Sequence, residues 1–162
     1  MTEDDDQGNF KLEGYTGGLG KGITTYFNDN KFSPSNQINS EKFQIMKFRH
    51  EVLDLIGIYR SQTGNSLELL QELRKIIDPG RVTIVGGDFN ACFLENSSNR
   101  LIDGLLVMGF DQLVHEATHI KGRLIDHVYF NDPTDKLKIT IERYSPYYTD
   151  HDGICVTLQG LA

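Results

Sequence analysis

Tryptophan is absent from this sequence of 162 residues, and only two cysteines, Cys92 and Cys155, occur in it. Two cysteines exclude the disulfide framework on which small secreted domains depend, so we expect two core thiols in a reducing, intracellular setting. No apolar run approaches the roughly 18 residues of a membrane helix, and no membrane partner is expected. The acidic first six residues also lack the basic and then apolar layout of a signal peptide.

Basic residues are few as well. The chain has 16 lysines and arginines against 23 aspartates and glutamates, which gives a net charge of −7. A protein that binds nucleic acid mainly through phosphates has a basic surface, and these totals do not predict one. Any nucleic-acid role must therefore come from a local site, where a metal cation offsets the repulsion.

Repeats, low-complexity tracts and interdomain linkers are missing too, so residues 1–162 are expected to form a single domain. Within it, residues 1–9 are expected to be a disordered acidic tail. Gly17, Gly18, Gly20 and Gly22 precede a strand-like run. A phosphate-binding loop follows a strand and precedes a helix, so these glycines predict a flexible turn instead.

The chain does contain alternating strand and helix patterns. Strand-like runs cover residues 23–27, 42–48, 52–59, 82–85, 125–130, 137–143 and 154–158. Apolar residues at helical spacing cover residues 66–77 and 100–108. The run at 82–85 is almost wholly apolar, as expected for a strand that is covered on both faces. This mixture favours a layered α/β fold.

Asp88 and Asn90 directly follow one predicted strand, in the sequence GDFN. On an extended backbone, residues two apart point the same way, while Phe89 between them would point into the core. A carboxylate beside an amide suits the activation of water next to a phosphate oxygen. A plain β-turn rich in Asp and Asn remains an alternative.

Asp126 interrupts the apolar run at 125–130, and a buried carboxylate needs a partner. Asp150-His151-Asp152 stands directly before the last strand. A buried aspartate commonly fixes the tautomer of a histidine and raises its pKa. We therefore expect His151 within about 2.6–3.2 Å of Asp126, the reach of a hydrogen bond. An exposed polar turn is the alternative for residues 150–152.

Residues 115–119 spell H-E-x-x-H, the pattern of a zinc protease, and Gly122 fits the longer metzincin form. The local apolar spacing allows a helix here. However, the third ligand position of that form is occupied by Ile125, and Gly122 and a strand follow too soon for the helix to continue. The zinc metalloprotease is thus the least favoured interpretation.

The ordered set GDFN, THIKGRLIDHVYF and SPYYTDHDGICV resembles the endonuclease/exonuclease/phosphatase superfamily, of which deoxyribonuclease I is a member. Within it, the sequence is most similar to the endonuclease domains of non-LTR retrotransposons, and LIGIYRS also resembles their strand ending in Tyr-Arg. The resemblance covers about residues 10–158. It implies a layered α/β sandwich of two mixed β-sheets flanked by helices.

By this resemblance the chain is a Mg²⁺-dependent (or Mn²⁺-dependent) endonuclease domain of a retrotransposon reverse-transcriptase polyprotein. It would be nuclear or cytoplasmic and would hydrolyse DNA phosphodiester bonds. Asp88 would orient or deprotonate the attacking water, and Asn90 would hold that water or a phosphate oxygen. The hydroxyl of Tyr59 would reach the phosphate, and Arg60 would add positive charge there.

The resemblance also implies that His151, paired with Asp126, contacts the scissile phosphate, and that Asp150 is a metal ligand. Members of the family open with further strands that carry an asparagine and the principal metal-binding glutamate. Here the Gly-rich segment begins at position 17, so we expect the N-terminal strands to be missing and the isolated chain to be weakly active or inactive. Glu3 is a conceivable substitute ligand. An inactive binding module and a phosphatase acting on a small phosphoester remain as alternatives.

Overall fold

The computed structural model describes residues 11–15, 22–27, 31–95 and 99–160. The acidic tail predicted for residues 1–9, Glu3 included, lies outside these described residues, as do Gly17, Gly18 and Gly20 of the predicted turn. None of the helices in the described ranges is long and apolar enough to cross a membrane.

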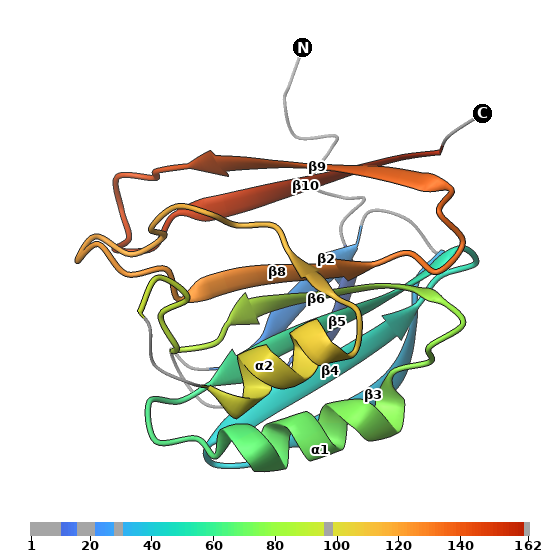
Figure 1. The fold of residues 1–162 in the computed structure, drawn as a ribbon, viewed down its shortest axis with the longest axis horizontal. Helices are drawn as coiled ribbons and strands as arrows, with labels where there is room; N and C mark the ends of the chain where they lie inside the picture. The colour runs from blue at the N-terminus through green and yellow to red at the C-terminus, as the bar shows by residue number, and fades with distance from the viewer. Residues whose placement is uncertain (1–10, 16–21, 28–30, 96–98, 161–162) are drawn as a thin grey trace.

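The largest layer is a mixed six-stranded sheet with the strand order β3-β4-β5-β6-β8-β7 (Figure 1). Its strands are β3 (Ser33–Asn39), β4 (Phe43–Arg49), β5 (Leu53–Arg60), β6 (Val82–Asp88), β7 (Asp111–Gln112) and β8 (Asp126–Asn131). All neighbours are antiparallel except β5 and β6, which are parallel because helix α1 (Ser66–Ile76) connects them. The ends of β5 and β6 and the start of β8 therefore meet at one edge of the sheet.

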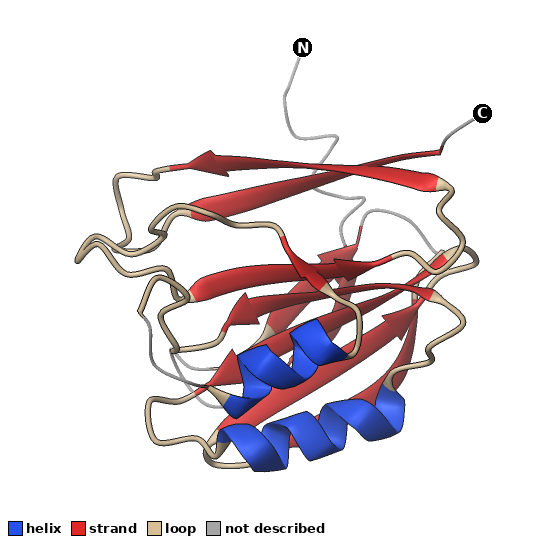
Figure 2. Ribbon diagram, in the orientation of Figure 1, coloured by secondary structure: helices blue, strands red, loops and turns tan. Residues whose placement is uncertain are grey.

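Helices α1 and α2 (Arg100–Val107) cover one face of this sheet (Figure 2). Asn65 caps α1 and Asn99 caps α2, each accepting two backbone N–H groups of the first turn. The helices approach closely at Gly104, where a Cβ would lie 2.3 Å from Leu70 Cδ2. Their apolar sides enclose the first core cluster together with β4, β5 and β6.

A two-stranded antiparallel sheet of β9 (Leu137–Tyr144) and β10 (Gly153–Gly160) lies across the opposite face (Figure 1). Alternate residues of both strands point toward the second core cluster of the large sheet: Leu137, Ile139, Ile141, Ile154, Val156 and Leu158. The residues between them are exposed, as the period of a strand requires. Cys155 is among them, so the expected core position is confirmed for Cys92 and wrong for Cys155. A further antiparallel pair is formed by β1 (Lys11–Tyr15) and β2 (Thr24–Phe27).

The predicted layered α/β arrangement is confirmed, with one mixed sheet, a second sheet and two helices. Two details differ from the prediction. In the described part of the chain, the second sheet is antiparallel and not mixed, and both helices pack on the same face of the six-stranded sheet. The register of the large sheet is the feature that positions the candidate site.

Candidate active site

Three adjacent strands carry predicted site residues at the same edge of the six-stranded sheet. Tyr59 of β5 lies opposite Asp88 of β6, and Asp88 lies opposite Asp126 of β8. Residues that are opposite in a ladder share one face of the sheet. All three residues are half-buried. The topology thus brings a tyrosine and two carboxylates together from distant parts of the sequence.

The end of β6 approaches β5 unusually closely. Gly87 has a φ of 141°, and a Cβ there would lie 1.9 Å from the carbonyl oxygen of Ile58. Buried Arg60 lies behind the following turn, donating from Nε to the Phe89 carbonyl at 2.6 Å and from Nη2 to the Asn90 carbonyl at 2.8 Å. Its third donor, Nη1, is 2.7 Å from the Gly64 carbonyl. Arg60 therefore holds the turn in place with two of its nitrogens and ties it to the segment between β5 and α1 with the third.

The backbone after Asp88 turns and is not extended, so the extended backbone from which a shared orientation of the Asp88 and Asn90 side chains was expected is not present. Asn90 has a φ of 47°, and its backbone N–H donates to Asp88 Oδ1 at 2.9 Å. Asn90 Nδ2 donates to the Arg60 carbonyl at 2.5 Å. Phe89 is fully buried, as predicted. The role of Asn90 toward a water or phosphate stays a prediction.

Asp126 and His151 form a hydrogen-bonded pair that joins the two sheets. His151 Nδ1 lies 2.8 Å from Asp126 Oδ2, within the predicted range. Burial lowers the pKa of His151, but the hydrogen bond and charge of Asp126 and the charges of Asp88 and Asp150 outweigh it, so the pKa is raised. The pair therefore favours a protonated imidazole beside the carboxylates.

Asp88 is placed to exchange protons. Burial raises its pKa and the charge of Asp126 adds to this, while the Asn90 N–H, His151 and Arg60 act in the opposite direction, and the net change is upward. Ligand atoms of Asp88, Asp126 and His151 all lie within 4.8 Å of one another. A carboxylate with a raised pKa next to a cationic imidazole suits general base chemistry.

Asp150 offers carboxylate oxygens on the solvent side of this cluster, with 61% of its side chain exposed. Its Oδ1 is 3.9 Å from His151 Nε2, and its Oδ2 is 3.2 Å from His119 Nε2. Mg²⁺ prefers oxygen ligands, keeps several waters and needs only one or two protein carboxylates. Asp150 fits such an ion as a carboxylate ligand, so the residues present are compatible with Mg²⁺ or Mn²⁺.

The zinc pattern does not form a zinc site. Residues 113–119 are not helical, so His115 and His119 do not share a helical face. His115 is exposed and lines a groove of about 360 Å³ with Glu116 and Arg143. His119 instead belongs to the site around Asp150. The zinc-protease interpretation is therefore wrong.

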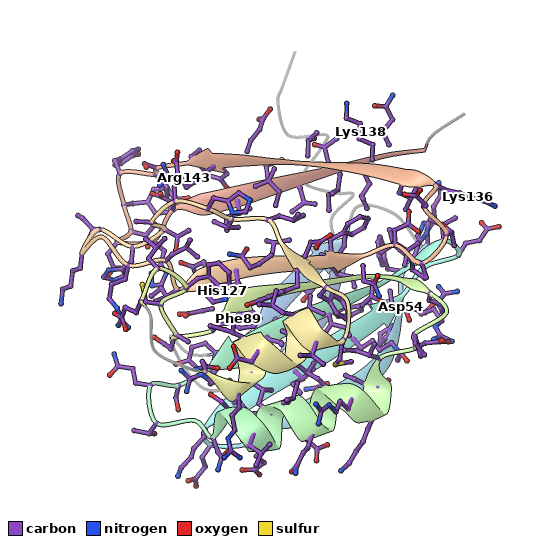
Figure 3. All side chains as sticks on the ribbon, in the orientation of Figure 1. Asp54, Phe89, His127, Lys136, Lys138 and Arg143 are labelled. Atoms are coloured by element: carbon purple, nitrogen blue, oxygen red, sulfur yellow. The ribbon has the colours of Figure 1, made fainter. Side chains whose placement is uncertain are left out.

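Sequence reasoning missed three residues that build the site. Thr118 Oγ1 accepts the backbone N–H of Asp126 at 3.1 Å and holds the start of β8. His119 contacts Asp150. Buried His127 has Nε2 2.8 Å from the Ala91 carbonyl, and its ring stacks on Phe89 (Figure 3). Thr118 and His119 lie in the THIKGRLID run that carries the family resemblance, which was the available signal.

No protein-family model matches this sequence, and no curated protein matches it. Solved structures do. The endonuclease domain of TRAS1, a telomere-specific non-LTR retrotransposon, is 16% identical with a TM-score of 0.67, over 94% of this chain and 79% of that chain. Truncated Caenorhabditis elegans TDP2 is 18% identical with a TM-score of 0.58, over 94% of this chain and 76% of that chain.

An endonuclease/exonuclease/phosphatase family protein from Leptotrichia buccalis C-1013-b is 14% identical with a TM-score of 0.60, over 93% of this chain and 69% of that chain. At such identities a likeness speaks for the fold alone. The chain therefore has the fold of the endonuclease/exonuclease/phosphatase superfamily, and the resemblance inferred from its motifs is confirmed at that level.

Proposed function

We propose that this chain is a Mg²⁺-dependent phosphodiesterase domain of the retrotransposon endonuclease type, which hydrolyses phosphodiester bonds in DNA. The shared fold supports the phosphodiesterase class, and the likeness to the TRAS1 endonuclease domain supports the finer type. The observation that carries the proposal is the Asp126–His151 pair beside Asp88 at the edge of the sheet.

In this reaction Asp88 orients a water and accepts its proton as the water oxygen bonds to phosphorus. The bond from phosphorus to the leaving sugar oxygen breaks with its electron pair on that oxygen, which takes a proton from solvent, and Asp88 later returns its proton to solvent. The raised pKa of Asp88 brings it closer to that of a useful base. Protonated His151 donates to a phosphate oxygen where negative charge develops. The Tyr59 hydroxyl, in register with Asp88, donates to another phosphate oxygen.

Asp150 is the residue that would hold Mg²⁺ or Mn²⁺, which when bound neutralises phosphate charge. The nuclear or cytoplasmic location stays a prediction. Because Asp150 is the one carboxylate assigned to the metal among the described residues, we expect a low rate, and the assay needs a high protein concentration and both metals.

The test is nicking of supercoiled plasmid with Mg²⁺, with Mn²⁺ and with EDTA. We expect metal-dependent nicking that His151→Ala lowers by about 100-fold or more. His115→Ala is the matched control, because His115 is an exposed histidine outside the site. Binding of DNA without any nicking would replace the proposal with an inactive binding module. Hydrolysis of small phosphoesters without nicking would replace it with a phosphatase.

A further inference from the structure

His119 reaches the candidate site from the segment between β7 and β8. Its Nδ1 accepts the backbone N–H of Lys121 at 3.1 Å. A ring nitrogen that accepts a hydrogen bond carries no proton, so the proton of the neutral imidazole is on Nε2. The backbone of Lys121 thus selects the Nε2–H tautomer.

The Nε2–H group donates to Asp150 Oδ2, at 3.2 Å. The His119 side chain is only 13% exposed, whereas that of Asp150 is 61% exposed. The largely buried His119 ring therefore fixes the position of one oxygen of the exposed Asp150 carboxylate. The other oxygen, Oδ1, is left on the side of His151, 3.9 Å from Nε2.

Main-chain contacts make this arrangement firm. His119 and His151 form a β-bridge, the Ile120 N–H donates to the Asp150 carbonyl at 2.9 Å, and the Asp152 N–H donates to the Thr118 carbonyl. The two imidazole rings lie 5.0 Å apart and nearly perpendicular. The His119 ring is thus fixed relative to the Asp150 main chain.

Two imidazoles and a carboxylate, His119, His151 and Asp150, have ligand atoms within 4.8 Å of one another. Such a set is typical of transition-metal sites. However, a metal on His119 Nε2 would require the proton to move to Nδ1, where it would face the Lys121 N–H. The backbone therefore opposes metal binding by His119.

We propose that His119 is a positioning residue that holds the Asp150 carboxylate ready for Mg²⁺ and is not itself a metal ligand. The inference rests on the proposed function, in which Asp150 binds the metal. Partners that orient a metal ligand in this way commonly change metal affinity by about 10-fold to 100-fold. Removal of His119 should therefore weaken metal binding more than it slows the chemical step.

The first test measures Mn²⁺ binding to the purified chain by the electron paramagnetic resonance signal of free Mn²⁺, together with the Mg²⁺ concentration that gives half-maximal nicking. We expect His119→Ala to weaken both by about 10-fold, with near-normal nicking at saturating Mg²⁺. His119→Gln can still donate to Asp150 and should recover much of the loss. His115→Ala, in the same segment, should behave as the unchanged protein.

Unchanged Mn²⁺ binding in His119→Ala would overturn the proposal, as would a nicking defect that saturating Mg²⁺ does not relieve. Zn²⁺ binding that needs His119 would show it to be a ligand.

The second test does not depend on any activity. Long-range ¹H–¹⁵N spectra of the histidine rings report which nitrogen carries the proton. The Nε2–H tautomer is expected for His119 with and without Mg²⁺, and the Nδ1–H tautomer would overturn the proposal. A chain that never nicks DNA but keeps this tautomer and loses Mn²⁺ affinity in His119→Ala would refute the nuclease proposal and leave the role of His119 intact.

Discussion

Asp126 both orients His151 and favours its protonated state, through a 2.8 Å contact with Nδ1. Asp126→Asn keeps the size of the side chain but removes its charge. We expect the pKa of His151 to fall toward its ordinary value of about 6.5 in this variant. An NMR titration of the His151 ring measures it, with the His115 resonance as an internal reference. An unchanged His151 pKa would show that the pair does not form.

The same pair makes stability depend on pH. The pKa of His151 is raised in the folded state, so the pairing contributes fully below its ordinary pKa of about 6.5 and is lost as pH rises through the raised value. We expect His151→Gln to lower the free energy of unfolding more at about pH 5.5 than at about pH 8.5. Denaturant unfolding of both proteins at each pH gives the difference. An equal loss at the two pH values would contradict this linkage.

The charge of Asp88 has the opposite effect on stability from the charge of His151. Its pKa is raised in the folded state, mainly by burial, so its ionised form opposes folding at neutral pH. Asp88→Asn should therefore abolish nicking yet raise the free energy of unfolding, by about 1 kcal/mol at pH 7. The gain should shrink as pH falls through the raised pKa of Asp88 toward its ordinary range. Chemical denaturation across this pH range tests it, and a destabilised variant would argue against the assigned burial effect.

The site could be predicted from sequence only where its signal is local. Asp126 stands out in the sequence as a carboxylate in an apolar strand, and His151 stands out by its place between two aspartates before the last strand. The conformation of Asn90 could not be foreseen, because Arg60 of another strand imposes it through the Phe89 and Asn90 carbonyls. The position of His119 likewise depends on a bridge to a distant segment.

At the scale of elements, the close approach of β5 and β6 at Gly87 should be necessary for stability. At Gly87 a Cβ would meet the Ile58 carbonyl oxygen at 1.9 Å, and the φ of 141° is strained for other residues. Gly87→Ala should lower the free energy of unfolding by about 2–3 kcal/mol and displace the neighbouring Asp88, reducing nicking. At Gly86 a Cβ would have only ordinary contacts, the nearest at 3.5 Å. Gly86→Ala is thus the control, and equal losses in thermal unfolding would contradict the prediction.

Elements with buried faces were predicted well, and exposed ones were not. The apolar spacing of α1 and the apolar runs of β4 and β6 reflect burial in the core. β3 (Ser33–Asn39) is almost wholly exposed at the edge of its sheet, so its sequence SPSNQIN has no apolar alternation. Its pairing with β4 comes from main-chain hydrogen bonds, which leave little trace in a sequence. Strand periodicity also does not encode direction, so the antiparallel second sheet could not be predicted.

For the molecule as a whole, the end of the large sheet away from Phe89 and His127 contains a buried charge cluster around Asp54 (Figure 3). Asp54 is fully buried and contacts Lys47, Arg49 and Arg81. Burial alone would raise its pKa, but these cations lower it, so the stabilisation holds above its ordinary pKa and is lost as pH falls through the lowered value.

Asp54→Ala leaves the buried Lys47 without its carboxylate partner and should cost about 3–5 kcal/mol of stability at neutral pH. Because Asp54 lies at the other end of the sheet, the folded fraction should keep its full nicking rate. Calorimetry and specific activity at low temperature together test this separation. A folded Asp54→Ala protein with altered metal dependence would show that the two ends of the sheet are coupled.

The site takes Asp88 and Asp126 from the large sheet but Asp150 and His151 from the approach to β10. The strands β9 and β10 alone are a two-stranded sheet, a structure that is marginal without support. Arg143 at the end of β9 contacts Glu116 and Asp152, and half-buried apolar residues pack beneath both strands. The contacts of residues 150–152 with Asp126, Thr118 and Ile120 hold only the approach to β10. Local opening of β9 and β10 costs less free energy than global unfolding of the domain. On warming, residues 153–160 should therefore open locally and exchange their amide hydrogens while the six-stranded sheet is still folded. Nicking activity should be lost at that stage, before global unfolding.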